Sequence, residues 1–439
     1  MKLKNKGFIL VFTVLAVFLS FGNVQAQNNT ANIADNKETP AFLNVKSDWA
    51  DSVFKSLTPE QRIAQLFMVA AYSNKEADHA AKIDKLVSDY KIGGLIFFKG
   101  SPIRQADLTN RYQKNAKTPL FIAIDGEWGL SMRLDSTVKY PRQMLLGAVQ
   151  DDALIYEMGQ QIGDQCKRMG IHINFAPVID VNNNANNPVI NNRSFGENKE
   201  NVTKLGLAYM KGMQEKNVLA CGKHFPGHGD TDTDSHKALP IIPHSFTRLD
   251  SLELYPFKQL INKGLASMMV AHLYIPILDN TENQASTLSP KIVNGLLKDS
   301  LGFEGLIFTD ALNMKGVSKY YAPGEVDVKA ILAGNDVLLF PEDVPVGISK
   351  IKEAIASGEI TQEEIDARCL KILKAKEWAG LNNYAPIETK NLYDDLNLPM
   401  YDVLNRKISK SAVTLIKNEA DALPLQHLNT QKTLYLNVG

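Results

Sequence analysis

The chain has 439 residues, of which 44% are hydrophobic and 22% are charged. These values are those of an ordinary globular protein, and they exclude a disordered, collagen-like or coiled-coil chain. The 48 Lys and Arg residues balance the 48 Asp and Glu residues, so no net basic charge indicates a nucleic acid or an anionic membrane as a partner. Three cysteines, Cys166, Cys221 and Cys369, are too few for a disulfide framework or a cysteine-based zinc site.

Residues 1–26 have the organisation of a secretory signal peptide. Three lysines precede an apolar run at residues 8–21, and small residues surround the expected cleavage point after Ala26. The run is short for a membrane span, and no cysteine follows Ala26 to carry a lipid. We therefore expect a periplasmic or secreted protein without a stable membrane anchor. Residues 27–45, rich in Asn, Thr and Ala, are predicted to be a flexible leader.

Eight short apolar runs alternate with longer segments of helical periodicity between residues 46 and 385. This alternation is typical of repeated βα units, and eight is the number of parallel strands that closes a barrel. We therefore predict an α/β fold, a (β/α)8 TIM-type barrel over residues 46–385. A doubly wound open sheet is the structural alternative. The predicted strands lie at residues 66–69, 94–98, 120–124, 172–176, 219–222, 267–270, 306–309 and 336–339.

The pattern changes after residue 385. A helical stretch at residues 401–415 leads into residues 420–425, and residues 433–439 have the composition of a buried strand that ends on a glycine. A single strand needs a sheet to join. We therefore interpret residues 386–439 as a linker and the beginning of a truncated C-terminal α/β domain, and we expect a longer parent chain.

Polar side chains stand at the ends of several predicted strands. In a parallel barrel the carboxyl ends of the strands meet at one mouth, where such folds hold their active sites. We therefore expect these side chains to converge. They are Asp125 and Glu127, Asp180 and Arg193, Lys223 and His224, His272, and Asp310.

Residues 223–236 contain three of the eight histidines together with three aspartates, so a metal site is the first hypothesis to test. An EF-hand does not fit, because its twelfth position holds Ile241 in place of glutamate. A zinc site from His224, His228 and His236 remains an alternative, although no HExxH helix is present. The sequence also lacks a GxSxG nucleophile elbow and a GxxxxGK[ST] phosphate loop.

Four segments together resemble the β-N-acetylglucosaminidase branch of glycoside hydrolase family three. Residues 223–236 resemble the signature of that branch, and residues 308–314 resemble the nucleophile segment of the family. Residues 124–129 and 192–196 resemble its sugar-binding loops. The resemblance runs from about Leu57 to Leu425 and keeps the order of the family. Trp128, Leu130 and Asn192 depart from the usual glycine, arginine and proline, which leaves the shape of the aglycone side open.

The resemblance implies a barrel that removes terminal β-linked N-acetylglucosamine with retention of configuration, without a metal or organic cofactor. It implies that Asp310 is the nucleophile, His236 the general acid/base and Asp234 the charged partner of His236. Sugar-binding roles are implied for Asp125, Arg133, Arg193, Lys223 and His224, and His272 is a weaker candidate for the same pocket. The expected substrates are cell-wall (peptidoglycan) fragments with terminal N-acetylglucosamine.

Two other functions remain open. An N-acetylglucosaminide phosphorylase would use the same site with phosphate in place of water, because a histidine acid does not repel phosphate as a carboxylate does. A glycan-binding protein without activity is the alternative from another class. We also expect Gly227, Gly229 and Ser235 to let the loop swing in to deliver the proton and out to admit the sugar. Trp128 is predicted to be a packed wall of the mouth rather than a stacking platform.

Overall fold

The computed structural model describes residues 37–439 except 234–238, 420–422, 426–428, 431 and 433–439. The predicted signal peptide, most of the predicted leader, Asp234, His236 and the predicted terminal strand therefore lie outside the described residues. At the described end of the leader, Glu38 forms a parallel bridge with Lys263, and the short 3-10 helix Ala41–Asn44 buries Phe42. Residues 37–45 thus belong to the folded body and not to a flexible leader.

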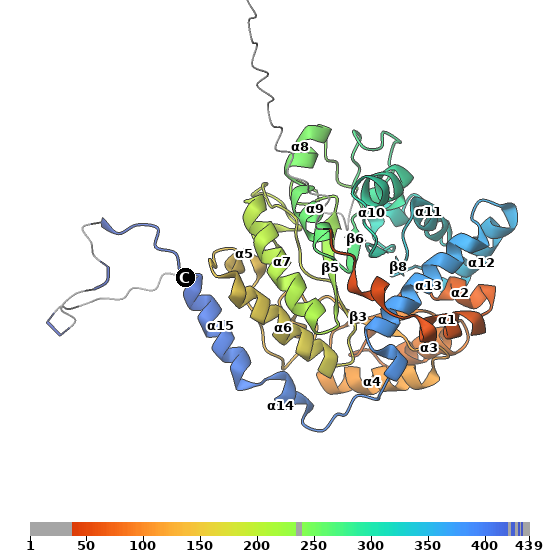
Figure 1. The fold of residues 1–439 in the computed structure, drawn as a ribbon, viewed down its shortest axis with the longest axis horizontal. Coiled ribbons are helices and arrows are strands. Elements are labelled where there is room, and N and C mark those ends of the chain that lie inside the picture. Colours follow the sequence, from red (N-terminus) through yellow and green to blue (C-terminus); the bar gives the residue numbers. More distant parts are fainter. Residues whose placement is uncertain (1–36, 234–238, 420–422, 426–428, 431, 433–439) are drawn as a thin grey trace, which may run out of the picture. The chain divides into compact units, whose positions relative to one another are not determined.

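Eight parallel strands form the centre of the fold, in the spatial order β7-β6-β5-β4-β3-β2-β1-β8 (Figure 1). A parallel bridge between Phe308 and Val337 joins the two outer strands of this order and closes the ring. The closed ring confirms the TIM-type barrel and rules out the open sheet. The strands are β1 Phe67–Tyr72, β2 Gly94–Phe98, β3 Phe121–Ile124, β4 Ile173–Asn174, β5 Leu219–Phe225, β6 Ser267–Val270, β7 Leu306–Thr309 and β8 Leu338–Leu339.

Helices surround the barrel in the expected alternation (Figure 1). Two short helices, α1 (Asp48–Ser56) and α2 (Pro59–Ala64), precede β1. The outer layer consists of α3 Ala77–Ser88, α4 Pro102–Asn115, α6 Asp152–Arg168, α7 Lys199–Glu215, α8 Phe246–Ser251, α9 Tyr255–Asn262, the π-helix Lys291–Ser300, α11 Glu325–Ala333, α12 Val344–Ser357 and α13 Gln362–Trp378. Two further short helices, α5 (Gln143–Leu146) and α10 (Lys315–Ser318), lie in the loops after β3 and β7.

Local sequence explains where these elements begin and why they pack. The side chain of Thr58 accepts a hydrogen bond from the Gln61 N–H at 3.2 Å, and Pro59 takes the first helical position of α2. Every residue of β3 and β5 is buried, since the barrel interior covers one face and the helices cover the other. Lys223 and His224, at the end of β5, are therefore polar residues held inside a barrel strand.

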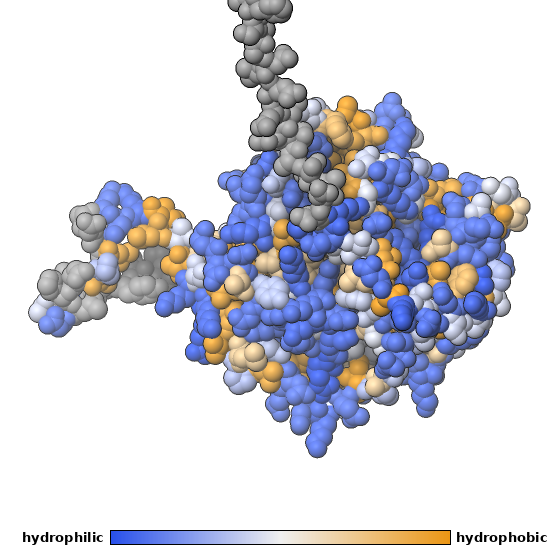
Figure 2. Space-filling view, viewed as in Figure 1, coloured by the Kyte–Doolittle hydropathy of each residue, from blue (hydrophilic) through white to orange (hydrophobic). Residues whose placement is uncertain are grey.

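Residues 386–411 pack on the barrel rather than forming a separate unit. The helices α14 (Leu392–Leu396) and α15 (Pro399–Ser411) lie against α6 (Figure 1), and Tyr401, Leu404 and Ile408 are buried there. This part of the predicted linker therefore completes the outer layer. Apolar side chains are exposed on the segment beyond α15 (Figure 2), including Val413 at 81% and Ile416 at 93%. Among the described helices, none has the length and the apolar character that crossing a bilayer requires.

Candidate active site

A cavity of about 480 Å³ lies at the carboxyl ends of the barrel strands, a volume within the range of about 300–1,000 Å³ usual for small-molecule sites. Six of the polar residues predicted from their strand-end positions line it together, which confirms that they converge at one mouth. They are Asp125, Glu127, Arg193, Lys223, His224 and Asp310, and Arg133 and His228 join them.

Lys223 is the central cation of the cavity wall. It extends from β5 with 2% of its side chain exposed, and its Nζ lies 2.8 Å from Glu127 Oε1 and 3.1 Å from Asp125 Oδ1. Arg133 Nη2 lies 2.6 Å from the other oxygen of Asp125. Burial alone would raise the pKa of Asp125, but Lys223 and Arg133 lower it below its ordinary value. Asp125 is thus held in its charged form.

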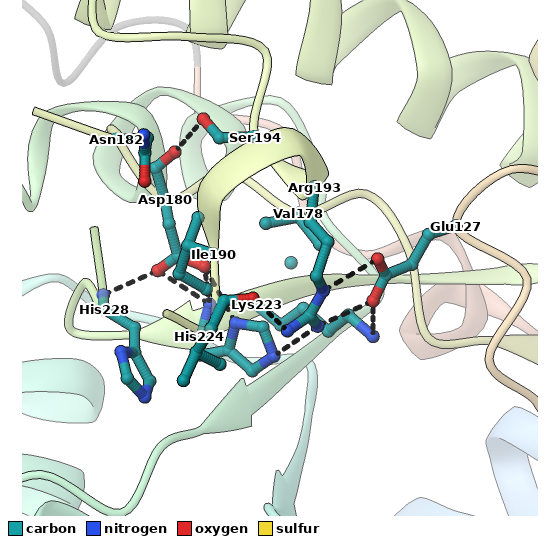
Figure 3. Close-up of polar contacts among 12 residues, drawn as sticks. Glu127, Val178, Asp180, Asn182, Ile190, Arg193, Ser194, Lys223, His224 and His228 are labelled. Carbon is teal, nitrogen blue, oxygen red and sulfur yellow. Dashed lines mark hydrogen bonds and ion pairs between the residues drawn. The ribbon is translucent and has the colours of Figure 1, made fainter. Parts of the chain in front are cut away.

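Arg193 and Glu127 form a bidentate ion pair (Figure 3). Arg193 Nε donates to Oε2 at 3.0 Å and Nη2 donates to Oε1 at 2.7 Å, while Nη1 donates to the Val189 carbonyl at 3.2 Å. Burial would raise the pKa of Glu127, but Arg193 and Lys223 together hold it far below its ordinary value. Charges of alternating sign therefore run along the wall in the order Arg133, Asp125, Lys223, Glu127 and Arg193.

His224 continues this arrangement to a second buried carboxylate. Its Nε2 lies 3.2 Å from Arg193 Nη2, and its Nδ1 lies 2.8 Å from Asp180 Oδ2. Burial would raise the pKa of Asp180, but its contacts with His224 and the hydrogen bond from the His228 N–H lower it. Asp180 itself is fully buried and does not line the cavity.

Asp310 follows β7 and reaches the cavity from the wall next to His224. Its N–H donates to the Val270 carbonyl at 3.0 Å, which fixes the backbone, and its Oδ1 accepts a hydrogen bond from the Ala311 N–H at 2.8 Å. Burial would raise the pKa of this carboxyl group, but the neighbouring His272 and the Ala311 N–H outweigh it, so the pKa lies below its ordinary value. Asp310 is therefore ionised at neutral pH, as a nucleophile must be.

His272 is fully buried and is not among the residues that line the cavity. Its Nε2 lies 3.0 Å from the Ala311 carbonyl and its Nδ1 lies 2.8 Å from Thr287 Oγ1. The predicted contact of His272 with the sugar stays a prediction. In the structure its ring contacts the backbone carbonyl that follows Asp310.

The loop after β5 is packed at its base. A Cβ on Gly229 would lie 1.8 Å from the Val181 carbonyl oxygen, and Gly227 has φ of 127° with Glu253 close by. The His228 carbonyl accepts from Asn187 Nδ2 at 2.8 Å. The two glycines are thus required by close packing and backbone conformation, and the expected swing of the loop stays a prediction. Asp234 and His236 lie outside the described residues, so their positions stay a prediction.

The two histidines of this loop that the structure describes, His224 and His228, have protein partners. His224 contacts Asp180 and Arg193, and His228 Nδ1 lies 2.8 Å from Thr231 Oγ1. Burial lowers the pKa of His228 to about 4. A second cluster, Asp230, His244 and Glu253, brings three possible metal ligands within 4.8 Å. Arg248 Nη2 lies 3.2 Å from Asp230 and 3.1 Å from Glu253, so a guanidinium already supplies the positive charge there.

Glu127, Asp180 and His228 belong to the site, but the sequence indicates no specific role for Glu127 and Asp180 and offers His228 only as a possible zinc ligand. Glu127 and Asp180 carry the strand-end signal, yet nothing local indicates their partners, which lie 66 and 44 residues away. No sequence pattern indicated the residues of the apolar cavity wall, which include Phe98, Met132 and Met314. Trp128 does not line the cavity, and its ring instead packs against the Arg142 guanidinium at 4.6 Å.

Residues 58–375, which include every strand and most of the outer helices, match the family model of the glycosyl hydrolase family 3 N terminal domain. The chain belongs to glycosyl hydrolase family 3. The family expected from the sequence is thereby confirmed.

Several named proteins are similar to this chain over most of the barrel. Beta-hexosaminidase A of Pseudoalteromonas piscicida is 34% identical over 377 residues, which cover 79% of this chain and 62% of the relative. Beta-hexosaminidase LpqI of Mycobacterium tuberculosis is 28% identical, covering 85% of this chain and 97% of LpqI. The structure of a family 3 β-N-acetylglucosaminidase from Paenibacillus sp. str. FPU-7 superposes with a TM-score of 0.76 at 36% identity, covering 83% and 70% of the two chains. The chain thus spans less than two thirds of the Pseudoalteromonas relative.

Proposed function

We propose that this chain is a retaining exo-β-N-acetylglucosaminidase that cleaves terminal β-linked N-acetylglucosamine through a covalent glycosyl-enzyme on Asp310. The observation that carries the proposal is one cavity in which an ionised carboxylate at a strand end meets a wall of fixed hydrogen-bond donors and acceptors. The wall residues are Asp125, Arg133, Arg193, Lys223 and His224.

The cavity has a charged wall and an apolar wall, which suit the hydroxyl groups and the apolar surfaces of the sugar. The charged wall offers donors and acceptors to the ring hydroxyls, as is usual where polar ligands are oriented. We assign the apolar wall to the carbon face of the ring and the methyl group of the N-acetyl substituent. The apolar residues are Ile96, Phe98, Met132, Val189, Met269, Met314, Leu339 and Phe340.

His236 is proposed to protonate the leaving oxygen, with Asp234 as its charged partner. The packed base of the loop supports this assignment, because His228 lines the cavity and residues 229–233 continue from it toward Asp234. His272 is proposed as a positioning residue that holds the Ala311 carbonyl, and with it the backbone of Asp310.

Water is proposed as the acceptor of the glycosyl group. The cations of the cavity wall, Arg133, Arg193 and Lys223, share the carboxylates of Asp125 and Glu127, and the ionised Asp310 lines the same cavity, so phosphate would meet no net excess of positive charge there. Product analysis with and without phosphate tests this step. Sugar 1-phosphate as the main product would favour the phosphorylase, and binding of N-acetylglucosamine without turnover would favour the glycan-binding protein.

Hydrolysis of 4-nitrophenyl β-N-acetylglucosaminide, compared with the matching β-glucoside, is the experiment that tests the function. We expect strong preference for the N-acetyl substrate and, in NMR spectra, the β-anomer as the first product. A first product in the α form would contradict retention. We further propose that the substrates are peptidoglycan fragments met outside the cytoplasm. Release of N-acetylglucosamine from muropeptides and recovery of a mature protein starting after Ala26 would support both points.

A further inference from the structure

A groove of about 960 Å³ lies between α5 and α15, on the side of the barrel where Figure 1 shows both helices. Residues 139–145 line it from the α5 side, and residues 402–409 of α15 line it from the other. Asn192, from the loop after β4, also lines it. The groove shares no lining residue with the catalytic cavity, so it is separate from the site that binds the cleaved sugar.

The groove carries an excess of positive charge. Lys139, Arg142 and Arg406 line it together with one carboxylate, that of Asp402. All three cations are exposed, and within the described part of the chain none of them forms an ion pair. The catalytic cavity differs, because it is lined by as many carboxylates as lysine and arginine side chains. A ligand with several carboxylates is therefore attracted to the groove and not to the cavity.

Arg142 is held in place by uncharged partners. Its guanidinium carbon lies 4.6 Å from the centre of the Trp128 ring, and its Nη1 donates to Asn192 Oδ1 at 2.8 Å. A guanidinium has five N–H groups, of which the described residues occupy one, so the others are available to an anion. Trp128 and Asn192 are two of the three positions at which this chain departs from the usual family pattern. Their shared contact with Arg142 links both departures to this groove.

The groove begins next to the catalytic cavity. Asn192, which lines the groove, directly precedes Arg193, which lines the cavity. Trp128, which holds Arg142, directly follows Glu127, the partner of Arg193. An extended peptide spans about 3.3 Å per residue, so a chain of three or four residues attached to a ligand in the cavity is long enough to pass this pair of loops.

We propose that the groove between α5 and α15 binds an acidic peptide attached to the substrate. The carboxylates of the peptide pair with Arg142, Arg406 and Lys139. Its apolar side chains lie on Met144 and Leu145, which are 39% and 42% exposed. The proposal rests on the proposed function, since it names the part of a peptidoglycan fragment that this chain binds in addition to the cleaved sugar.

Two substrates that differ only in charge test this proposal. One is the disaccharide of N-acetylglucosamine and N-acetylmuramic acid with its peptide attached, and the other is the same molecule with the peptide carboxylates converted to amides. At low ionic strength we expect kcat/KM to be about three- to tenfold higher for the acidic form, the scale of two or three exposed ion pairs. The ratio should approach one at high ionic strength. A ratio of one at low ionic strength would overturn the proposal.

Two variants assign the effect to the groove. Asn192→Asp places a carboxylate beside Arg142 without changing the size of the side chain, and Arg406→Gln removes a cation from α15. Both should lower the ratio toward one. Because the ratio compares two substrates on the same variant, a general loss of activity or stability cancels from it.

Lys407→Gln is the matched control. It removes the same charge from the next position of α15, but Lys407 does not line the groove. This variant should keep the ratio of the wild type. An equal fall of the ratio in Lys407→Gln and Arg406→Gln would show that the overall charge of the protein, and not the groove, is responsible, and would overturn the proposal.

Binding of the peptide is measured independently of catalysis by saturation-transfer NMR, with the free peptide of the same fragment added to the full chain. The wild type should transfer saturation to the acidic peptide, whereas Asn192→Asp should transfer much less, as should the wild type with the amidated peptide. Equal transfer to the acidic and the amidated peptide would contradict the proposal. Failure to cleave any N-acetylglucosaminide would refute the proposed function, while the NMR result still decides whether the groove binds the peptide.

Discussion

Lys223 Nζ lies 2.8 Å from Glu127 Oε1, and neither side chain is more than 2% exposed. Such a pair is costly to break, because the remaining charge is left buried without its partner. The same carboxylate also pairs with Arg193, so Glu127 is shared between two cations of the cavity wall.

Glu127→Gln should therefore damage both the site and the fold. We expect destabilisation of about 3–5 kcal/mol, the scale for breaking a buried pair, and a large loss of kcat/KM as Lys223 and Arg193 lose their positions. Urea unfolding and steady-state kinetics measure the two effects. The control is Glu353→Gln, which removes an exposed ion pair with Lys350 and should change neither. Unchanged kinetics in Glu127→Gln would show that the cations keep their positions without it.

Asp310→Asn should abolish turnover while sugar binding survives. The amide keeps the shape of the carboxylate but removes the charge that meets the anomeric centre, so the loss of kcat should span several orders of magnitude. Binding of N-acetylglucosamine, followed by calorimetry, should stay within a few-fold of the wild type. A 2-fluoro or 5-fluoro glycoside should label Asp310 in the wild type, and a label on another carboxylate would contradict the assignment.

His236→Ala should affect substrates according to their leaving groups. A nitrophenolate leaves with little protonation, whereas a sugar alcohol needs a proton, so the variant should lose far more activity on chitobiose than on the nitrophenyl glycoside. Rates on both substrates for the wild type and the variant measure the difference. Equal losses on the two substrates would remove His236 from the role of the acid. The hypothesis of a zinc site would then have to be tested, by measuring whether chelators lower the activity.

Lys376→Met should stabilise the protein, and more so at low pH. Lys376 on α13 is fully buried with one hydrogen bond to Gln65 Oε1 at 2.8 Å, and burial lowers its pKa to about 7. The lysine of the unfolded chain titrates near 10.4, so the unfolded state binds more protons than the native state between about pH 7 and pH 10. Burial of Lys376 therefore lowers the free energy of unfolding most below about pH 7.

We expect a gain of about 1–3 kcal/mol at pH 6 for Lys376→Met, after the loss of the Gln65 hydrogen bond, and a smaller gain at pH 9. Urea unfolding at both pH values measures it. Lys55→Met, an exposed lysine, is the control and should show no such dependence on pH. A gain that does not shrink between pH 6 and pH 9 would show that Lys376 is not deprotonated in the native state.

The sequence predicts the barrel well because each strand is an apolar run of its own. All eight predicted runs become strands or meet one, although β4 is reduced to two residues and β5 extends to Phe225. The convergence of Asp125, Lys223 and Asp310 follows from topology alone, since the carboxyl ends of parallel strands share one mouth.

Features that depend on partners far apart in the chain were not predictable in this way. The pairing of Asp180 with His224 spans 44 residues, and neither residue type indicates it. In the sequence Gly229 suggested a flexible loop. In the structure a glycine is needed there because the Val181 carbonyl leaves no room for a side chain. The helices at residues 392–411 looked like a link to another domain, whereas their apolar faces complete the outer layer over α6.

The alternation of charge along the cavity wall has a consequence for how substrate arrives. Three cations, Arg133, Arg193 and Lys223, line the same cavity as three carboxylates, Asp125, Glu127 and Asp310, so their fields largely cancel a short distance from the wall. An uncharged glycoside is then neither attracted nor repelled from afar, and kcat/KM for such a substrate should hardly change between low and high ionic strength. What the wall offers is a set of dipoles that are already oriented before the sugar enters, so little reorganisation accompanies the reaction.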